Sequence, residues 1–228
     1  MLRQTPAHDW PTRLPRKVAV VCVLAGVLLT AALPAAALPP HERDGVMVGL
    51  SLGYGPGRLE LFPVAGEPTV RSGKESGSTP QIRLGYAVLR DHLLVVLENR
   101  QWIVEQGLLA EDKLRINTQC WTLGLSWYPG DPATAAGGFY VQAGGGLANA
   151  RLTLLEPAED NPWGEMFHEV GKQDEQGAAF YAALGYEFRI LTHAAVGLSA
   201  GYTYLSVGED IFDTAQNWPL CLTLNWYW

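Results

Sequence analysis

The stretch Leu220–Trp228, LCLTLNWYW, changes the kind of side chain at every second residue. One set of positions carries only large apolar or aromatic residues, namely Leu220, Leu222, Leu224, Trp226 and Trp228. The set between them is Cys221, Thr223, Asn225 and Tyr227. Side chains of a β-strand point alternately to opposite faces, so this stretch predicts a strand with one strongly apolar face.

A similar alternation returns along most of the chain after residue 45. In the segment Val46–Tyr54, for example, Val48, Leu50 and Leu52 share one side, whereas glycine and serine occupy the other. Eight such segments can be distinguished, with 93–100 the least regular. They cover residues 46–54, 81–88, 93–100, 121–127, 139–148, 180–189, 193–204 and 220–228. The pattern predicts an all-β protein, an eight-stranded antiparallel up-and-down β-barrel.

Alternation alone does not say which face of the barrel lies inside. A water-soluble barrel needs Lys, Glu and Asp on its outer face, whereas only 17% of this chain is charged. The less apolar face consists mostly of Gly, Ala, Ser and Thr, which suit a narrow, crowded interior. The large apolar face is therefore expected to meet lipid, and the barrel is predicted to be transmembrane. A soluble ligand-binding barrel is a competing interpretation.

The connectors between the segments alternate in length. Short ones are expected around Arg90–Asp91, at residues 129–138 and around Leu191–Thr192. Longer ones are expected at residues 56–80, 102–114, 153–176 and 207–217. Outer-membrane barrels have short periplasmic turns, longer outer loops and an even number of strands, so the phase of these connectors predicts that topology.

The N-terminal region has the layout of a signal peptide. Basic residues up to Lys17 are followed by the apolar run Val18–Leu33 and by the small residues Ala35–Ala37. This order predicts a cleavable signal at residues 1–37 and a mature barrel domain at residues 38–228. The net charge of −7 would become −10, because the signal holds four basic residues and one acidic residue. An acidic mature chain argues against nucleic acid as a partner.

Several segments resemble the small eight-stranded outer-membrane barrel family of the OmpA, OmpX and OmpW type. The resemblance rests on FYVQAGGGLA (139–148), FYAALGYEFRI (180–190) and the terminal LCLTLNWYW (220–228), and it extends over 46–228. It implies residence in the outer membrane of a Gram-negative bacterium. Outer-membrane lipid and lipopolysaccharide are the implied surroundings of a monomer.

The same resemblance implies a role for the terminal strand. Family members end in alternating apolar residues and a terminal aromatic residue, which the outer-membrane assembly machinery recognises as an insertion signal. The family usually has Phe at the end, and Trp228 departs from that pattern conservatively. The implied assembly signal consists of Leu220, Leu222, Leu224, Trp226 and Trp228.

Charged residues recur on the face predicted to point inward. A tight turn at Arg90–Asp91 would place Arg83 opposite Glu98, because both lie equally far from the turn. Ion pairing among such residues would plug a narrow lumen. They could form the gate of a weakly conducting channel, although an eight-stranded barrel is just wide enough for its own side chains, which favours a structural core. The lumen charge cluster is Arg83, Glu98, Arg100, Glu187 and Arg189.

Catalytic and metal-binding chemistry is not expected. Cys120 and Cys221 fall on strands predicted to lie on opposite walls, so we expect two free thiols. His92 and His193 belong to the periplasmic turns, and His168 has no nearby serine in its loop, so no Ser-His-acid arrangement is visible. The prediction is a non-enzymatic protein without cofactor or metal.

The third long connector is strongly acidic. It could form a divalent-cation site helped by Trp163, Met166 and Phe167, but runs of charge are usually a solvated surface, and that interpretation is favoured. The acidic residues are Glu156, Glu159, Asp160, Glu165, Glu169, Asp174 and Glu175, with Lys172 as the one base among them.

Together these features predict an integral outer-membrane protein with a structural, surface-interaction or small-solute passage role. The alternative is a porin-like, OmpW-type narrow channel for small hydrophobic molecules.

Overall fold

The computed structural model describes residues 42–61, 72–107, 113–157, 167–207 and 212–228. The predicted signal peptide and His41 lie outside these residues. The strands are β1 (Val46–Leu61), β2 (Ser72–Leu89), β3 (Leu93–Gly107), β4 (Lys113–Trp127), β5 (Phe139–Pro157), β6 (Phe167–Leu191), β7 (Ala194–Val207), β8 (Phe212–Asn217) and β9 (Leu220–Tyr227). A short 3₁₀ helix, η2 (Ala135–Gly138), precedes β5. Within these ranges, no helix is long and apolar enough to cross a membrane.

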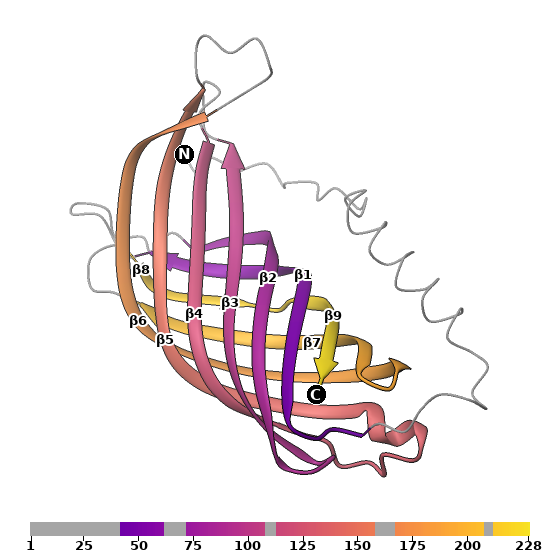
Figure 1. Ribbon diagram of the computed structural model, residues 1–228. Coiled ribbons are helices and arrows are strands. Elements are labelled where there is room, and N and C mark those ends of the chain that lie inside the picture. Colours follow the sequence, from indigo (N-terminus) through magenta and orange to yellow (C-terminus); the bar gives the residue numbers. More distant parts are fainter. Residues whose placement is uncertain (1–41, 62–71, 108–112, 158–166, 208–211) are drawn as a thin grey trace, which may run out of the picture. The chain divides into compact units, whose positions relative to one another are not determined.

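The strands form a closed antiparallel ring, which confirms the predicted eight-stranded barrel (Figure 1). β8 and β9 together make the eighth strand, and both pair with β1 and β7. The register on each neighbour continues unshifted across Trp218–Pro219, where proline lacks the N–H that a ladder hydrogen bond needs. The ring closes where the Trp228 N–H donates to the Val46 carbonyl at 2.9 Å.

The width of the barrel follows from its register. A row of directly opposed residues that starts at Leu50 of β1 returns to β1 at Glu60, ten residues further along. The row runs through Ile82, Asn99, Trp121, Leu147, Ala178, Ser206 and Thr214. A stagger of this size in a ring of eight strands requires steeply tilted strands and leaves an interior that side chains can fill.

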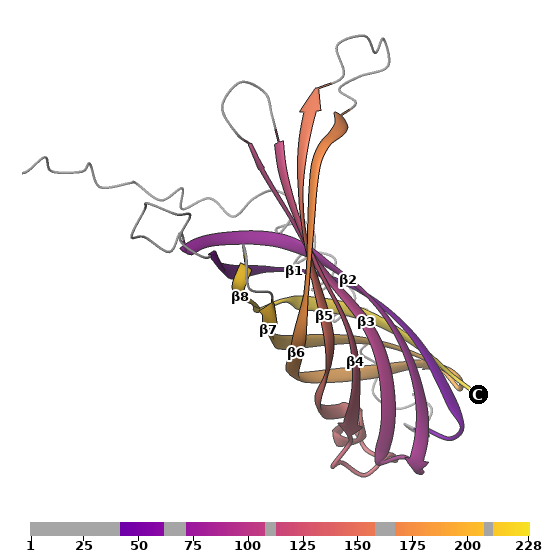
Figure 2. The same ribbon diagram turned by 90° about the vertical axis from the view of Figure 1, so that its left-hand side faces the viewer.

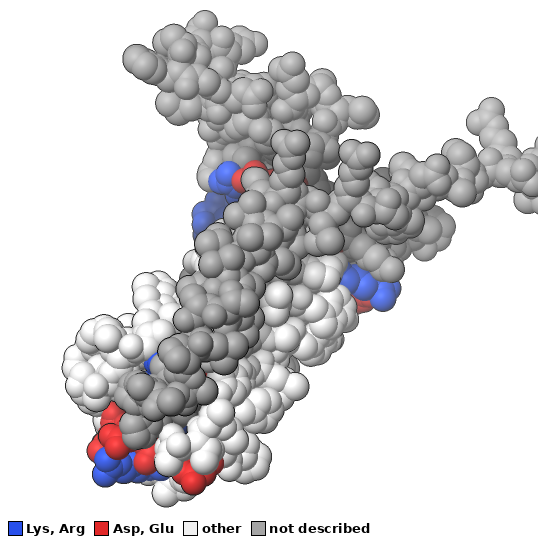
Figure 3. All heavy atoms as spheres, turned by 90° about the vertical axis from the view of Figure 1, so that its right-hand side faces the viewer, with Lys and Arg blue, Asp and Glu red and all other residues white. Residues whose placement is uncertain are grey.

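The outer wall carries an apolar belt that charged residues leave free. Figure 3 shows one side of it, where blue and red atoms gather toward the ends of the wall. Aromatic residues lie near its lower border, and the rings of Trp226 and Trp228 are 6.2 Å apart. The exposed belt includes Val48, Leu50, Leu52, Ile82, Leu84, Tyr86, Leu97, Trp121, Leu123, Leu125, Trp127, Leu147, Phe180, Leu184, Leu220, Leu224 and Trp226. Such a surface is stable in lipid and unfavourable in water.

The strands are longer than the alternation predicted, so the expected loops at 102–114 and 153–176 are largely strand. The reason is that the polarity of the two faces reverses along each strand. On β4, Trp121 is exposed and Thr122 is buried, but further up Gln119 and Arg115 face outward and Ile116 is buried. The upper part therefore resembles a water-soluble barrel, with an apolar inside and a polar outside.

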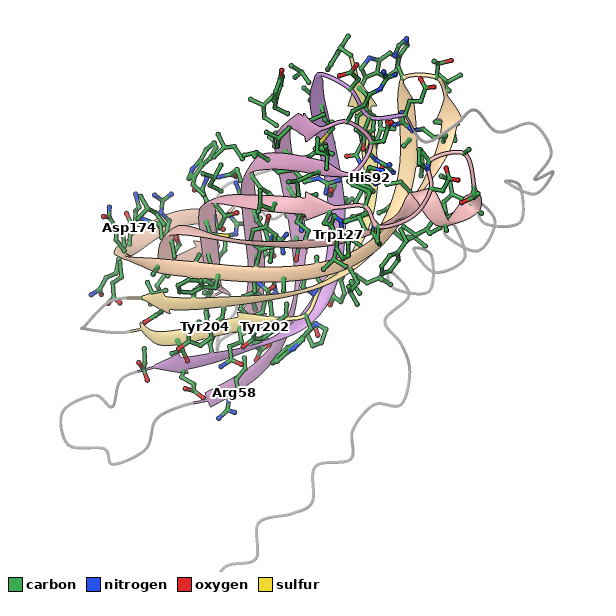
Figure 4. The ribbon with its side chains drawn as sticks, turned by 90° about the horizontal axis from the view of Figure 1, so that it is seen from below. Arg58, His92, Trp127, Asp174, Tyr202 and Tyr204 are labelled. Atoms are coloured by element: carbon green, nitrogen blue, oxygen red, sulfur yellow. The ribbon has the colours of Figure 1, made fainter. Side chains whose placement is uncertain are left out.

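Strands β3 to β6 project beyond their neighbours (Figures 1 and 2). The pairing of β6 with β7 ends at Gly177 and Val207. Above that point, residues 167–176 of β6 pair with β5 and with no other strand in the described part of the chain. Asp174 and Arg58 mark this end of the barrel in Figure 4, and His92 and Trp127 mark the other.

The short turns lie where they were expected. The His92 N–H donates to the Leu89 carbonyl at 3.1 Å, and Asp91 adopts a positive φ of 65°. His92 itself lies in this turn, and His193 lies in the turn between β6 and β7.

Candidate functional site in the barrel lumen

The lumen contains a central polar layer built on a buried ion pair. Arg100 Nη2 lies 2.8 Å from Glu98 Oε1, and Arg100 Nε donates to the same oxygen at 3.1 Å. Both residues belong to β3, two positions apart, so their side chains share the inward face. Gln142 Nε2 donates to the other Glu98 oxygen at 3.0 Å, and the Arg100 guanidinium stacks over the Tyr181 ring at 4.5 Å. The carboxylate is thus held from two strands.

Arg83 lies opposite Glu98 in the register, as the turn position predicted. Its guanidinium nevertheless donates elsewhere, to Asn225 Oδ1 at 2.7 Å and to Gln142 Oε1 at 3.5 Å. The ion-pair partner of Glu98 is Arg100. Cross-strand opposition fixes where two backbones meet, but a long side chain can reach across the lumen to another wall.

A second polar layer, here called the turn-side layer, closes the end of the lumen at which the short turns lie, and it is built around Glu187. This carboxylate is fully buried and accepts hydrogen bonds from Tyr128 at 3.0 Å, Tyr227 at 2.8 Å and Asn225 at 2.5 Å. Arg43 Nη2 lies 3.3 Å from it and completes the ring of donors. Several donors from different parts of the chain thus converge on one buried carboxylate, which makes these hydrogen bonds charge-assisted and strong.

Arg43 was not among the residues singled out from the sequence. It precedes β1, where no alternation exists to indicate a direction. Asp91 holds the segment in place by accepting from the Arg43 N–H at 2.6 Å, while the Arg43 guanidinium stacks on Tyr128 at 3.5 Å. The segment before β1 therefore covers the mouth of the barrel at the end with the short turns.

Arg189 also lies in this layer. Its guanidinium stacks over the Tyr227 ring at 4.2 Å and donates to the carbonyls of Glu42 and Thr192. All five residues of the predicted lumen cluster are buried, but they divide between two layers: Arg83, Glu98 and Arg100 in the central one, Glu187 and Arg189 in the turn-side one.

An apolar layer fills the upper lumen. Its largest member is Trp102, which is 1% exposed. The indole occupies space that two glycines leave open: a Cβ on Gly57 would lie 2.2 Å from Trp102 Cζ2, and one on Gly77 would lie 2.7 Å from Trp102 Nε1. The buried residues packed with it include Leu59, Val104, Ile116, Ala150, Leu205, Val207 and Ala215. Together, the three layers describe a filled lumen.

Cys120 and Cys221 are free and buried, as predicted. Cys221 Sγ accepts from Gln81 Nε2 at 3.3 Å. In the described ranges, no group of three or more His, Cys, Asp and Glu side chains could hold a metal ion.

The acidic connector is partly strand. Asp174 lies on β6 and pairs with Arg151 at 2.6 Å and with Lys172 at 3.2 Å. The hydrogen bond from Arg151, together with Lys172, lowers the pKa of Asp174. Residues 158–166, which include Glu159, Asp160, Trp163 and Glu165, lie outside the described residues, as do the side chains of Glu156, Met166, Phe167, His168 and Glu169.

The residues of the predicted assembly signal face outward from the last strand. Leu220, Leu224, Trp226 and Trp228 are exposed and Leu222 is half-buried, while the residues between them point into the lumen. This strand pairs on both sides, with β1 and β7.

No protein-family model matches the chain, and no curated protein matches it. Several solved structures, however, match the chain in fold. The attachment invasion locus protein Ail of Yersinia pestis, in complex with the heparin analogue sucrose octasulfate, gives a TM-score of 0.51 at 12% identity, over 80% of this chain and 99% of that chain. Neisserial surface protein A gives 0.47 at 14% identity, over 81% of this chain and 98% of that chain.

The outer membrane protease OmpT of Escherichia coli also matches, with a TM-score of 0.44 at 7% identity, over 86% of this chain and 99% of that chain. At 12% identity, the similarity to Ail concerns the fold alone. At the level of the fold the expected resemblance is confirmed, and the chain has the fold of the small eight-stranded outer-membrane barrels.

Proposed function

We propose that this chain is a non-enzymatic, monomeric outer-membrane protein whose closed barrel anchors a projecting β-sheet for interactions at the cell surface. Its apolar belt supports a membrane location, and the fold supports the outer membrane. The outer-membrane assembly machinery would insert it through the terminal strand, and lipopolysaccharide would surround it. Neither a cofactor nor a nucleic acid has a part in this function.

The observation that carries the proposal is the edge of β6 above Gly177, which pairs with no strand among the residues that the structure describes. The Gly201 N–H donates to the Pro219 carbonyl, so odd-numbered residues of β7 direct their backbone groups to the eighth strand. The even-numbered residues of β7 then face β6, and Tyr202 meets Ala182 there. By the same alternation, Lys172 and Asp174 direct their backbone N–H and C=O groups to the open side.

An open strand edge offers hydrogen bonds to an extended peptide. The charged side chains of Lys172 and Asp174 disfavour indiscriminate pairing with apolar segments. The expected partner is therefore an extended, polar peptide segment that adds a strand to β6. The filled lumen argues against small-solute passage as the main task.

Peptide selection on the bilayer-embedded protein tests the proposal. A phage-displayed peptide library would be selected against the protein in nanodiscs, and recovered peptides would be measured on variants. Lys172→Pro removes one N–H from the open edge and leaves the hydrogen bonds to β5 in place. Binding should be lost in Lys172→Pro and kept in Lys172→Ala; equal binding to both variants would contradict the proposal.

A second candidate is an OmpW-type route for small hydrophobic molecules. An apolar groove of about 440 Å³ opens on the outer wall over Ala182, Ala200 and Gly201. Tyr202 and Trp218 also line it, with their rings 5.5 Å apart and tilted by 37°. The ladder is weakened beside it, because Pro56 and Pro219 lack N–H groups.

Filling the groove tests this second candidate. Ala182→Trp should lower uptake of a small aromatic hydrocarbon by proteoliposomes. Leu123→Trp, on the belt two strands away from Ala182 and outside the groove, serves as the control. Equal uptake by wild type and by protein-free liposomes would exclude the route.

A further inference from the structure

Four neighbouring strands carry carboxamide side chains in one cross-strand row above the apolar belt. Gln101 of β3 lies opposite Gln119 of β4, which lies opposite Asn149 of β5, which lies opposite Gln176 of β6. Directly opposed residues in antiparallel strands have Cβ atoms about 4.5–5.5 Å apart. These four residues, the amide row, thus form a continuous strip of uncharged hydrogen-bonding groups on the wall.

The amide row lies at the border between two surroundings. The next outward positions below it on β4 and β5 are Trp121 and Leu147, which oppose each other and are 54% and 75% exposed. The next outward positions above Asn149 and Gln176 are Arg151 and Asp174, which form an ion pair. Figure 4 shows Asp174 at the left-hand end of the barrel, away from His92. The row therefore occupies the depth at which lipid headgroups meet acyl chains.

A groove of about 270 Å³ opens at this border. It is lined by Gln119, Trp121, Leu147, Asn149, Arg151 and Gln176. Its lower residues are apolar and its upper residues polar, so its occupant must be amphipathic in the same direction as an outer-leaflet lipid.

The chemistry of the lining indicates the headgroup. Carboxamides offer two donors and an acceptor each without net charge, which matches hydroxyl-rich groups. Trp121 supplies an aromatic face with an N–H, an amphipathic surface suited to the membrane interface. The Arg151 guanidinium already bonds to Asp174, at 2.6 Å, so the amides are the main polar recognition groups.

We infer that the amide row and its groove bind the sugar headgroup of an outer-leaflet glycolipid, with the acyl chains running down over Leu147 and Trp121. This inference rests on the outer-membrane location proposed above.

Native mass spectrometry of the detergent-solubilised protein tests the site with three probes. Lipid A carries sugar and phosphate, diglucosyl diacylglycerol carries sugar alone, and phosphatidylglycerol carries phosphate without a sugar. We expect both glycolipids to bind wild type in preference to phosphatidylglycerol. In Gln119→Leu/Asn149→Leu, glycolipid occupancy should fall by about tenfold, since two hydrogen-bonding groups are lost.

The matched control is Ser76→Leu/Ser206→Leu, which makes the same kind of change at exposed positions of β2 and β7. Its glycolipid occupancy should equal that of wild type. Unchanged binding in the amide variant overturns the inference, and so does an equal loss in the control. Loss of binding to lipid A alone, or preference for phosphatidylglycerol, also overturns it, because phosphate would then be the determinant.

Heat-modifiable gel mobility and recovery in the outer-membrane fraction separate this inference from the proposed function. Wild type that is absent from outer membranes contradicts the location itself. Wild type that is present there, yet shows no glycolipid preference, contradicts the lipid site alone.

Discussion

Trp102 and the two glycines beneath it determine how the upper lumen is filled. The indole occupies the positions that side chains of Gly57 and Gly77 would take. A tightly packed interior does not accept extra atoms without displacement of its neighbours. These glycines are therefore needed for the space they leave.

Gly57→Ala should destabilise the barrel by about 1–3 kcal/mol, because the new methyl group overlaps the Trp102 ring. Urea unfolding of the protein in lipid vesicles measures the change. Gly171→Ala is the control, since a Cβ there would meet nothing within 4 Å. Equal stability of the two variants would show that the indole moves away at little cost.

Glu187 is the acceptor on which the turn-side layer depends. Glu187→Gln keeps the shape but removes the charge that faces Arg43, which should cost about 3 kcal/mol. The matched control is Glu105→Gln, whose exposed pair with Arg115 should contribute less than about 1 kcal/mol. The same urea titration compares them, and similar losses in both variants would contradict a special role for Glu187.

The inward direction of charged side chains was readable from the sequence because strand alternation has a period of two. The choice of partner was not readable. Glu98 pairs with Arg100 on its own strand, and Arg83 reaches Asn225 on another wall. Long side chains select partners in three dimensions, and Arg43 lies outside any alternating segment.

At the scale of elements, the last strand closes the ring through the backbone of Trp228 and Val46. Its outward residues are exposed, so they remain accessible to a receptor during insertion.

We predict that Trp228→Ser slows assembly several-fold in proteoliposomes carrying the assembly machinery, whereas Trp228→Phe assembles at the wild-type rate. The reason is that the terminal aromatic group is lost only in the serine variant. Appearance of the heat-modifiable band over time measures the rate. Similar rates for Trp228→Ser and wild type would remove this residue from the assembly signal.

The strand positions were predictable from alternation, but the strand ends were not. Above the belt, apolar residues such as Val104 and Ile116 move to the inward face and charged residues take the outward one. A prediction that expects the apolar residues to stay on the same face of the strand therefore ends the strand at that point. The alternation also predicted too short an eighth strand. Pro219 interrupts the pattern, although the pairing with β1 continues before and after this residue.

At the scale of the whole molecule, three layers fill the lumen in series. Each contains a large buried side chain: Trp102 and Arg100, which both belong to β3, and Arg43, which precedes β1. Closure in series means that the loss of one layer leaves the others in place.

Planar-bilayer recordings should therefore show no stable current for wild type, for Arg83→Ala or for Trp102→Ala. Current steps are expected only when the three layers are weakened together, in Arg43→Ala/Arg100→Ala/Trp102→Ala. Circular dichroism confirms that the triple variant keeps its strands. A channel opened by a single substitution would show that one residue acts as a gate.

The reversal of polarity along the strands also determines how deeply the barrel is inserted in the bilayer. Sinking it by one row would immerse the amide row in hydrocarbon, where each carboxamide without a partner costs several kcal/mol. Raising it by one row would lift Trp121 and Leu147 into water. The sequence thus determines the position of the membrane boundary on the barrel to within one row of residues. A thinner or thicker bilayer must adapt to the protein rather than the protein to the bilayer.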